Sequence, residues 1–462
     1  MRKLTGVMIA ALIIWVQPIF AQQEQQKAFT LKEAVDFAKR NNYSLLNSKL
    51  DLESSQKKVN EILASGLPQI NGSANLTNNL IIGSQIINFG GQSTVIKFGT
   101  NYNSSFGVSA SQLIFDGTFF MGLKASKEFV NLSKLNVNRS EIETEVSVSK
   151  AYYLCLLLSV NEELMGKNIE NLQKSKNDLE QIYKNGFAEK IDFDRLTLQL
   201  SNLQLQRDKI HDQKLLAQMI LKLQMGMPVN SPIDLTDKLE DLFQKSTAEV
   251  VPDKVDYNSR IEYKMLKKQL VLNNYDKKRY NVGYLPTLAA FYNNQRNTFG
   301  NNFSNLYRSP YSDSSGRFPN SYTDSVSKYP NIYKGSAIGL SLTVPIFDGF
   351  RKNAQIQQTK INIRKTENDM KNFENVIEQQ VFQSKTNYLR TKQQIEIQKK
   401  NMELAQQIYA KAELKYKNGV GSSLELTTAQ TDLENSRSNY LSTIYDFFVA
   451  DLDLKKAVGA IK

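Results

Sequence analysis

The stretch that most constrains the fold runs from Asp348 to Gly419, because nothing within it can end a helix. It contains neither proline nor glycine between Gly349 and Gly419, and these are the two residues that interrupt helices most strongly. At a rise of 1.5 Å per residue, a helix over this stretch is ~100 Å long. That length is too great for an ordinary globular domain. The sequence therefore predicts a long helix that needs partners of equal length.

A seven-residue repeat within this stretch indicates how the helix packs. The repeat consists of Val381, Tyr388, Ile395, Met402, Tyr409 and Tyr416. A second row lies four residues before the first. It begins with Ile377 and continues with smaller or more polar residues, namely Ser384, Thr391, Gln398, Ala405 and Ala412. A period of 3.5 residues is typical of helices that pack knobs-into-holes against long neighbours.

The first 21 residues have the pattern of a cleaved secretory signal. Arg2 and Lys3 precede an apolar run over 7–16, and Ala21 ends the segment before the polar QQEQQ. The apolar run is shorter than the ~18–20 residues that a membrane-spanning helix needs. We expect cleavage after Ala21 and, because no cysteine follows the cut, no lipid anchor at that point.

The single cysteine and the single histidine limit the chemistry. Cys155 lies in an apolar helical run and His211 in a polar stretch. One of each is too few for a His/Cys metal cluster within one chain, and there is no GxSxG motif. Without a zinc-finger or RNP-type motif, the net charge of +12 favours solvated helix faces over nucleic-acid binding. We expect no enzyme activity, no cofactor, no metal site and no nucleic-acid partner.

After the signal, the chain is an internal duplication. Three features recur at an offset of 232 or 233 residues: FDG at 115–117 and 347–349, YKNG at 183–186 and 416–419, and glycine at 226 and 459. Each half has the same expected order of helix, strand, polar loop, strand, long helix and shorter helix. The predicted repeats are 22–245 and 246–462.

Four segments have the two-residue period of β-strands. They are about 67–80, 103–115, 285–295 and 337–347. One face of each is apolar and the other carries small polar residues, as where Ile338 and Leu340 alternate with Gly339 and Ser341. Such alternation fits a membrane strand between lipid and a wet lumen, and equally a soluble sheet covered on one side. The signal and the Asn-, Ser-, Tyr- and Gly-rich segment 297–336, typical of an exposed barrel loop, favour the membrane alternative.

Four strands per chain cannot close a membrane barrel, because about eight strands is the minimum. An open sheet edge in lipid leaves backbone groups without hydrogen-bond partners. If the strands span a membrane, two, three or four copies of the chain must therefore share one barrel.

The helices that return from the two NG turns carry heptad rows of their own. Large residues form one row at Leu426, Leu433, Tyr440, Phe447 and Leu454, and Leu196, Leu203, Ile210 and Ala217 form another, with Leu198 and Leu205 beside it. Such rows let each helix contact two neighbours. An ordinary antiparallel bundle is the alternative, and the predicted helix length argues against it.

Together these features resemble the TolC family of outer-membrane efflux proteins. The resemblance rests on an LP pair before each first strand, FDG after each second strand and a Y-x-x-G turn in each half. The segment 419–433, GVGSSLELTTAQTDL, is similar to the family's second helical turn. The likeness extends over residues 28–460.

The resemblance implies a mainly α-helical trimer with a shared 12-stranded outer-membrane β-barrel and a 12-helix periplasmic α-barrel. It implies an outer-membrane location in a Gram-negative bacterium, with contact to outer-membrane lipid. The implied function is the outer-membrane channel of a tripartite efflux or type I secretion system. Such a channel is a passive export duct without a cofactor, which docks a periplasmic adaptor (membrane fusion) protein and an inner-membrane pump of the RND or ABC type. A secreted coiled-coil structural or adhesive protein without a pore remains the alternative.

The resemblance also implies roles for residues at and beyond the turns. The residues that would meet the adaptor are Asn185, Gly186, Asn418, Gly419 and Val420. Those that would line the pore constriction are Glu425, Thr428 and Asp192. Family members often place two acids three residues apart here; Glu425 matches the first position, and Thr428 departs from the second.

The same residues also have purely structural explanations. An NG pair suits the left-handed end of a helix in any fold. Acids in the first turn of a helix, as at Asp192 and Glu425, are stabilised by the helix dipole whatever their function.

Overall fold

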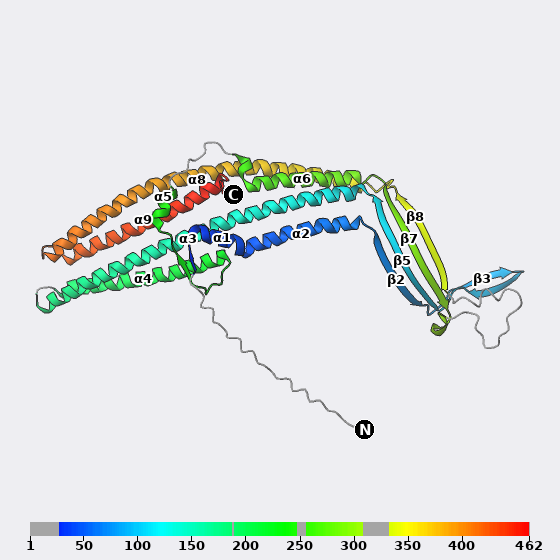
Figure 1. Cartoon of the computed structure of the whole chain (residues 1–462), viewed down its shortest axis with the longest axis horizontal. Coiled ribbons are helices and arrows are strands. Elements are labelled where there is room, and N and C mark those ends of the chain that lie inside the picture. The colour runs from blue at the N-terminus through cyan, green and yellow to red at the C-terminus, as the bar shows by residue number, and fades with distance from the viewer. Residues whose placement is uncertain (1–26, 187–188, 247–255, 308–331, 462) are drawn as a thin grey trace, which may run out of the picture. The chain divides into compact units, whose positions relative to one another are not determined.

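The computed structural model describes residues 27–186, 189–246, 256–307 and 332–461. This part of the chain is mainly helical and forms two compact units (Figure 1). The helical unit comprises the described residues up to Leu46, those within 140–255 and those from Gln380 onwards. The strand unit comprises the described residues within 47–139 and 256–379. The predicted signal, 1–21, and most of the predicted loop 297–336 lie outside the described residues.

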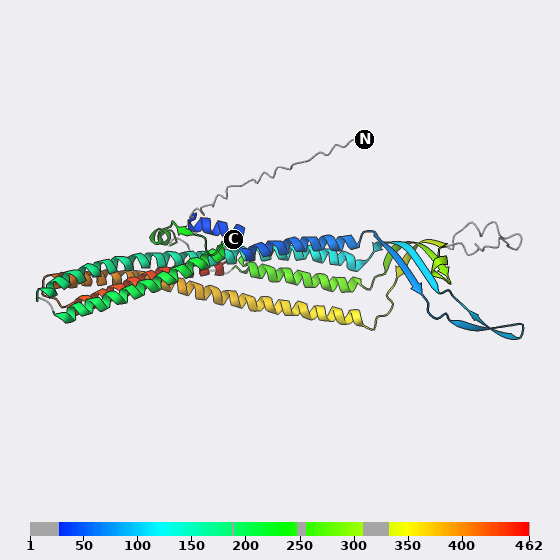
Figure 2. The same ribbon diagram turned by 90° about the horizontal axis from the view of Figure 1, so that it is seen from below.

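The helical unit is built from four long helices, which run alongside one another (Figure 2). They are α3 (Gly117–Lys184) and α8 (Arg351–Lys417), which both begin in the strand unit, and α4 (Lys190–Met225) and α9 (Ser423–Ala457). The smaller elements are β1 (Lys27–Phe29), α1 (Leu31–Asn41), the start of α2 (Tyr43–Ser65), β6 (Ile233–Leu235) and α5 (Leu239–Ser246). β1 pairs with β6 in parallel.

The predicted long helix is confirmed, because α8 continues without a break for 67 residues. Its seven-residue repeat faces the interior: Val381, Tyr388 and Ile395 are buried, and the next three positions are partly buried. Several of the residues between them are buried as well, namely Ile377, Thr391, Ala405 and Ala412. The repeat therefore marks the packing face of α8, as knobs-into-holes packing requires.

Aromatic residues form the core where α3, α8 and α9 meet. The ring of Tyr153 stacks on that of Phe448, with 4.3 Å between centroids. Phe447 contacts Tyr388 at 5.3 Å, and both phenylalanines are almost completely buried. Each buried ring contributes ~1.5–3 kcal/mol of transfer free energy, so this cluster is a main source of stability in the helical unit.

The strand unit contains a four-stranded antiparallel sheet in the order β2–β5–β7–β8. The strands are β2 (Gln69–Asn78), β5 (Tyr102–Phe115), β7 (Thr287–Gly300) and β8 (Ile332–Thr343). The unit also contains most of α2, the first parts of α3 and α8, α6 (Ile261–Val282) and the short η1 (Tyr257–Ser259) and η2 (Phe303–Asn305). The pairing of β8 ends at Thr343, short of residue 347, because Pro345 has no N–H to donate to a neighbour.

Between β2 and β5 the sequence predicts a polar loop, and this is wrong in part. The segment forms a hairpin of β3 (Ser84–Phe89) and β4 (Gln92–Lys97). Its two-residue turn is Gly90–Gly91, with φ of +59° and +86°. A hairpin turn with both central residues at positive φ matches the twist of its strands, and glycine adopts that conformation without strain.

Two helix ends share the same backbone conformation in different surroundings. Gly226 after α4 and Gly419 after α8 both have φ of +73°. A Cβ added to Gly226 would lie 2.1 Å from the carbonyl oxygen of Asn41, whereas one added to Gly419 would meet nothing within 4 Å. Gly226 therefore requires glycine both for its positive φ and for its close approach to Asn41. Gly419 requires glycine for its positive φ alone.

This difference predicts unequal effects of alanine. Gly419→Ala should cost about 1 kcal/mol, the usual penalty of a left-handed alanine. Gly226→Ala should cost roughly 2 kcal/mol more, because the clash is with backbone that no side-chain rotation relieves. Thermal loss of helical circular dichroism in detergent measures both, and equal shifts for the two variants would contradict this assignment.

Candidate functional site

The turn between α8 and α9 closes α8 with a Schellman motif. The N–H of Gly419 donates to the carbonyl of Tyr416 at 3.0 Å. The N–H of Val420 reaches back to the carbonyl of Lys415 at 3.1 Å. These bonds satisfy two carbonyls that the end of a helix otherwise leaves unpaired. Val420 itself is 78% exposed, so the turn presents an apolar side chain to its surroundings.

The turn after α3 begins in the same way. Gly186 has φ of +79°, and its N–H donates to the carbonyl of Tyr183 at 2.9 Å. Asn185 and Gly186 are exposed, as are Asn418 and Gly419 in the other turn. All five residues predicted to meet an adaptor are therefore accessible in the single chain.

Asp192 connects the two returning helices. It lies in the first turn of α4, and its carboxylate accepts a hydrogen bond from the hydroxyl of Ser423 at the start of α9. Ser423 is buried, and a guanidinium nitrogen of Arg195 lies 3.5 Å from its Oγ and 4.0 Å from Asp192 Oδ1. Burial and the nearby charge of Asp192 raise the pKa of Tyr416. The hydrogen bond between Ser423 and Asp192 therefore links α4 to α9.

Glu425 is bound to its own turn. Its backbone N–H donates to Ser422 Oγ at 3.1 Å, which caps α9. Its carboxylate lies 2.8 Å from the ammonium of Lys415, at the end of α8. Because both side chains are about half exposed, the ion pair contributes little to stability. Thr428, one turn further along α9, is exposed. Glu425 and Thr428 therefore share an accessible face, whereas Asp192 is engaged between helices.

A second polar cluster, which no local sequence pattern predicts, lies deeper in the helical unit. Glu434 of α9 accepts hydrogen bonds from Asn168 of α3 and, at 3.0 Å, from Gln430. Arg437 donates to Asn168 Oδ1 at 3.1 Å and also to Gln406 of α8. The cluster joins three helices. Asn168 and Glu434 are 266 residues apart in the chain, so no local pattern could have paired them.

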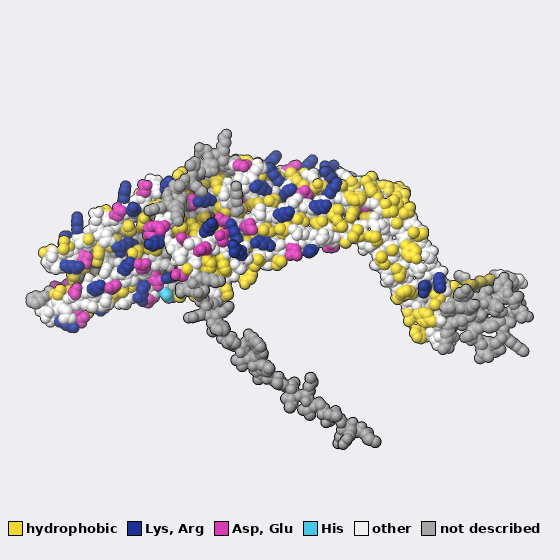
Figure 3. Space-filling model, in the orientation of Figure 1, with side chains coloured by type: hydrophobic (Ala, Val, Ile, Leu, Met, Phe, Trp, Pro, Cys, Tyr) yellow, Lys and Arg dark blue, Asp and Glu magenta, His cyan; other side chains and the backbone are white. Residues whose placement is uncertain are grey.

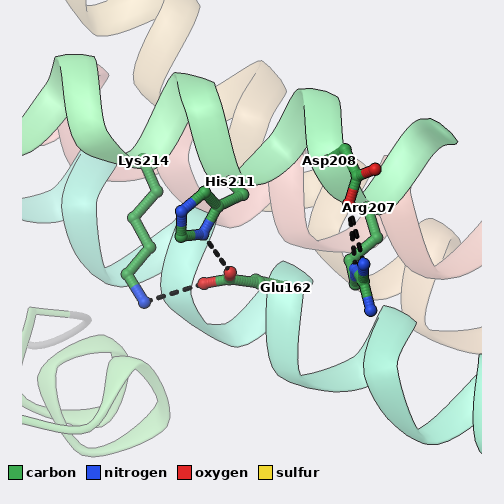
Figure 4. A network of polar contacts seen from close by, with 5 residues as sticks. All are labelled: Glu162, Arg207, Asp208, His211 and Lys214. Carbon is green, nitrogen blue, oxygen red and sulfur yellow. Dashed lines mark hydrogen bonds and ion pairs between the residues drawn. The ribbon is translucent and has the colours of Figure 1, made fainter. Parts of the chain in front are cut away.

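His211 takes part in a surface ion network, as Figure 4 shows. Its Nδ1 lies 2.7 Å from one carboxylate oxygen of Glu162, and the ammonium of Lys214 lies 2.8 Å from the other. These two partners, Lys214 foremost, lower the pKa of Glu162. Glu162 and Lys214 also line a pocket of about 380 Å³ beside β6. Cys155 is buried, and burial raises the pKa of its thiol to about 12, which keeps it unreactive.

The two faces of the four-stranded sheet differ in chemistry. One face carries large apolar residues that are exposed, among them Ile70, Leu76, Phe106, Ile338, Leu340 and Leu342. The other face carries mainly small and polar residues, such as Ser73, Ser109 and Gly339. Figure 3 shows few charged side chains over the strands and many over the helices. A band of exposed apolar side chains next to a polar reverse face is typical of a sheet between lipid and water.

Among the described residues, no helix has an apolar stretch long enough to cross a bilayer. The same residues hold no group of three histidine, cysteine or acidic side chains placed to bind a metal ion.

Comparison with known proteins identifies one matching family. The model of the outer membrane efflux protein family matches residues 285–460. No curated protein sequence matches the chain.

Several solved outer-membrane channels share the fold. CusC aligns with a TM-score of 0.70 and 16% identity, over 93% of this chain and 91% of its own. VceC from Vibrio cholerae aligns with a TM-score of 0.67 and 16% identity, over 93% and 96%. MtrE from Neisseria gonorrhoeae, solved in its open state, gives 0.68 and 16%, over 93% and 88%. At these identities the likeness establishes the fold.

The cluster around Glu434 predicts a pH dependence of stability. Burial, partly opposed by Arg437 and by hydrogen bonds from Asn168 and Gln430, raises the pKa of Glu434 above 4.5. Between that raised pKa and about 4.5, the folded state holds more protons than the unfolded state, so this group's contribution favours folding as pH falls.

Glu434→Gln should therefore stabilise the protein at pH 7 by on the order of 1 kcal/mol. It should also remove this pH dependence, as followed by thermal unfolding between pH 7 and pH 4.5. Glu163→Gln is the control, because Glu163 is 67% exposed and pairs with Lys167 on the surface of α3. Lys167 lowers the pKa of Glu163, so this variant should show no gain in stability at pH 7. A destabilised Glu434→Gln protein with an unchanged pH slope would contradict the argument.

Proposed function

We propose that the chain, whose residues 285–460 match the outer membrane efflux protein family, is a member of that family and the outer-membrane duct of a tripartite export system. Members of this family are passive channels and not enzymes. The protein is accordingly an outer-membrane channel that extends into the periplasm. Family membership gives no support to the alternative of a secreted rod without a pore.

The observation that carries the duct proposal is the exposed apolar face of the sheet. Leu340 and Leu342 are 69% and 63% exposed on β8, and Ile70 is 72% exposed on β2. In water such a face would promote aggregation, whereas in a bilayer it is the surface that lipid requires. The small polar residues of the reverse face would line a wet lumen.

The open edges of the sheet support a shared barrel. β2 and β8 are the edge strands, and neither can remain unpaired in lipid. Three copies would close twelve strands into one barrel, and β8 of each copy would pair with β2 of the next. The same three copies would bring twelve helices into one periplasmic tunnel.

Exposed apolar residues of the helical unit also favour contact with neighbouring copies. On α4, Leu198 and Leu205 are 63% and 70% exposed, and on α8, Phe382 and Leu389 are 74% and 52% exposed. Each pair is spaced seven residues apart, the period at which one helix faces another. We assign these residues to contacts between copies.

The duplication supports a pseudo-symmetric subunit. The predicted repeats, 22–245 and 246–462, would each supply one strand pair, β2 with β5 or β7 with β8. Each would also supply one long and one returning helix, α3 with α4 or α8 with α9. Alternation of the two halves around the trimer would give six similar positions for partners at the turns.

The turns are the proposed docking sites for a periplasmic adaptor, which would connect the duct to an inner-membrane pump of the RND or ABC type. Asn185 and Gly186 in one turn and Asn418, Gly419 and Val420 in the other are accessible and chemically similar. Exposed Val420 would give such a partner an apolar contact. Glu425, Thr428 and Asp192, just beyond the turns, are the proposed constriction.

The duct proposal predicts an oligomer that forms pores. The purified protein in detergent should have the mass of three chains by light scattering corrected for detergent, and it should conduct ions across a planar bilayer. A protein that conducts no ions across the bilayer, and that stays monomeric and soluble without detergent, would instead support a secreted rod.

The constriction proposal predicts a change in ion selectivity. Glu425→Gln keeps the cap on Ser422, because that cap uses the backbone N–H, but removes one negative charge per chain. If three copies of Glu425 face the pore, the variant should lose cation selectivity and be blocked less by multivalent cations.

Glu413→Gln is the matched control. Glu413 pairs with Lys417 in the last turns of α8, so this variant removes the same charge close to the same turn. Reversal potentials in a salt gradient measure the selectivity of both. Equal selectivity in wild type and Glu425→Gln would remove Glu425 from the constriction.

A further inference from the structure

Two cations stand on the apolar face of the sheet, and nothing in the proposed function explains them. Arg296 on β7 and Lys334 on β8 are the only charged side chains on the four strands of the sheet, all of which the structure describes. The strand register places them directly opposite each other. Both are exposed.

The register also places the pair on the face that would meet lipid. Across β7, the partner of Arg296 on β5 is Phe106, which is 56% exposed. Ile338 and Leu340 lie on the same face of β8 as Lys334, four and six residues further along, and are 85% and 69% exposed. The two cations therefore continue a row of lipid-facing side chains.

The pair lies at the end of the sheet remote from the helices. β7 follows α6 and β8 leads to α8, so these strands meet the helices at Thr287 and Thr343. Arg296 is eight residues beyond Leu288, which is ~26 Å along the strand at 3.3 Å per residue. With a strand tilt of about 45°, this is ~19 Å along the membrane normal, near the upper limit of a ~25 Å apolar band.

Aromatic residues lie two to four residues further along the strands than the cation pair, at Ser104 and Tyr102 of β5. Phe303 and Tyr307, which follow β7, are both 59% exposed. Phe303 packs against Tyr102, the first residue of β5, and the hydroxyl of Tyr307 lies 3.0 Å from that of Ser104. Aromatic side chains collect where the hydrocarbon of a membrane meets its headgroups.

Like charges directly opposite each other on neighbouring strands repel. No acidic side chain in the described part of the chain forms an ion pair with Arg296 or Lys334. A lipid-facing cation pair is stable when an anion from the surroundings lies between the two charges. A guanidinium beside an ammonium provides a two-pronged donor and a point charge, the combination that suits a phosphate.

We propose that Arg296 and Lys334 bind a phosphate group of lipid A, the glycolipid of the outer leaflet. The proposal rests on the duct function above, which places this end of the sheet at the outer surface. Phospholipid headgroups of the inner leaflet would lie at the opposite end, where the strands join the helices. The site takes a phosphorylated glucosamine headgroup, and Phe106 packs against its acyl chains.

The test compares Arg296→Gln/Lys334→Gln with wild type, both purified as trimers and depleted of bound lipid. Native mass spectrometry in detergent counts lipid A molecules and gives their affinity. Loss of two phosphate-binding cations should weaken binding by about tenfold or more. Lys399→Gln/Lys400→Gln, which removes two exposed cations of α8, should bind like wild type.

Two further lipids test the chemistry. Lipid A without its phosphates should bind wild type as weakly as phosphorylated lipid A binds the double variant. Phosphatidylglycerol, whose single phosphodiester carries one negative charge, should bind wild type more weakly than lipid A does and lose less affinity in the double variant. Without added lipid, the double variant should unfold at the same or a higher temperature than wild type, because it lacks the repulsion between the two cations.

Equal affinity of wild type and double variant for lipid A would overturn the proposal, and so would equal binding of lipid A with and without phosphates. Pore conductance is recorded on the same samples. If the samples conduct ions but the double variant binds lipid A as tightly as wild type, the lipid site alone is refuted. If wild type forms no pores, the duct proposal is refuted as well.

Discussion

The constraint on which the rest of the structure depends is the hydrogen-bonding demand of the two open sheet edges. Strands β2 and β8 are the edges of the sheet, and lipid cannot satisfy their backbone groups, so the proposed barrel requires strands from further copies. Chain connectivity extends this requirement to the helices. β2 follows α2, β5 leads to α3, β7 follows α6 and β8 leads to α8. Every strand therefore continues into one helix, and any ring that closes the strands also fixes how many helices stand beside one another.

The helical unit also has apolar surface that remains exposed in the single chain. Its interior repeat on α8, with Tyr388 and Ile395, is already buried within the single chain. A second set of apolar residues, including Leu205 on α4 and Phe382 on α8, remains exposed. Transfer from water is worth ~25 cal/mol per Å² of apolar surface, so covering these exposed stripes would favour the proposed association between copies. In the proposed trimer, another copy of the chain would cover both the sheet edges and the helix stripes.

The sequence predicted those features whose signal is periodic. The long uninterrupted α8 and its buried heptad follow from spacing alone, and the four strands of the sheet lie close to the alternating segments. The β3–β4 hairpin was missed although Gly90–Gly91 signals a tight turn, because its flanks alternate poorly. β8 begins at Ile332, before the predicted start, since Lys334 interrupts the apolar pattern there. Leu198 and Leu205, expected beside a packed row, are exposed in the single chain, and we assign them to contacts between copies. The Asn168–Glu434 contact depends on tertiary packing that no local pattern encodes.

Within the helical unit, the chemistry of packing changes along α9. Its first turn is joined to α4 through the hydroxyl of Ser423 and the carboxylate of Asp192. Its later turns bury Phe447 and Phe448 against other rings. When helices separate, polar groups exchange their partners for water at little net cost, typically about 1 kcal/mol per bond. Aromatic rings that lose their contacts forfeit ~1.5–3 kcal/mol each. Separation of the helices is therefore least costly at the turns, where the residues proposed for the constriction lie, and most costly at the aromatic core that holds the unit together.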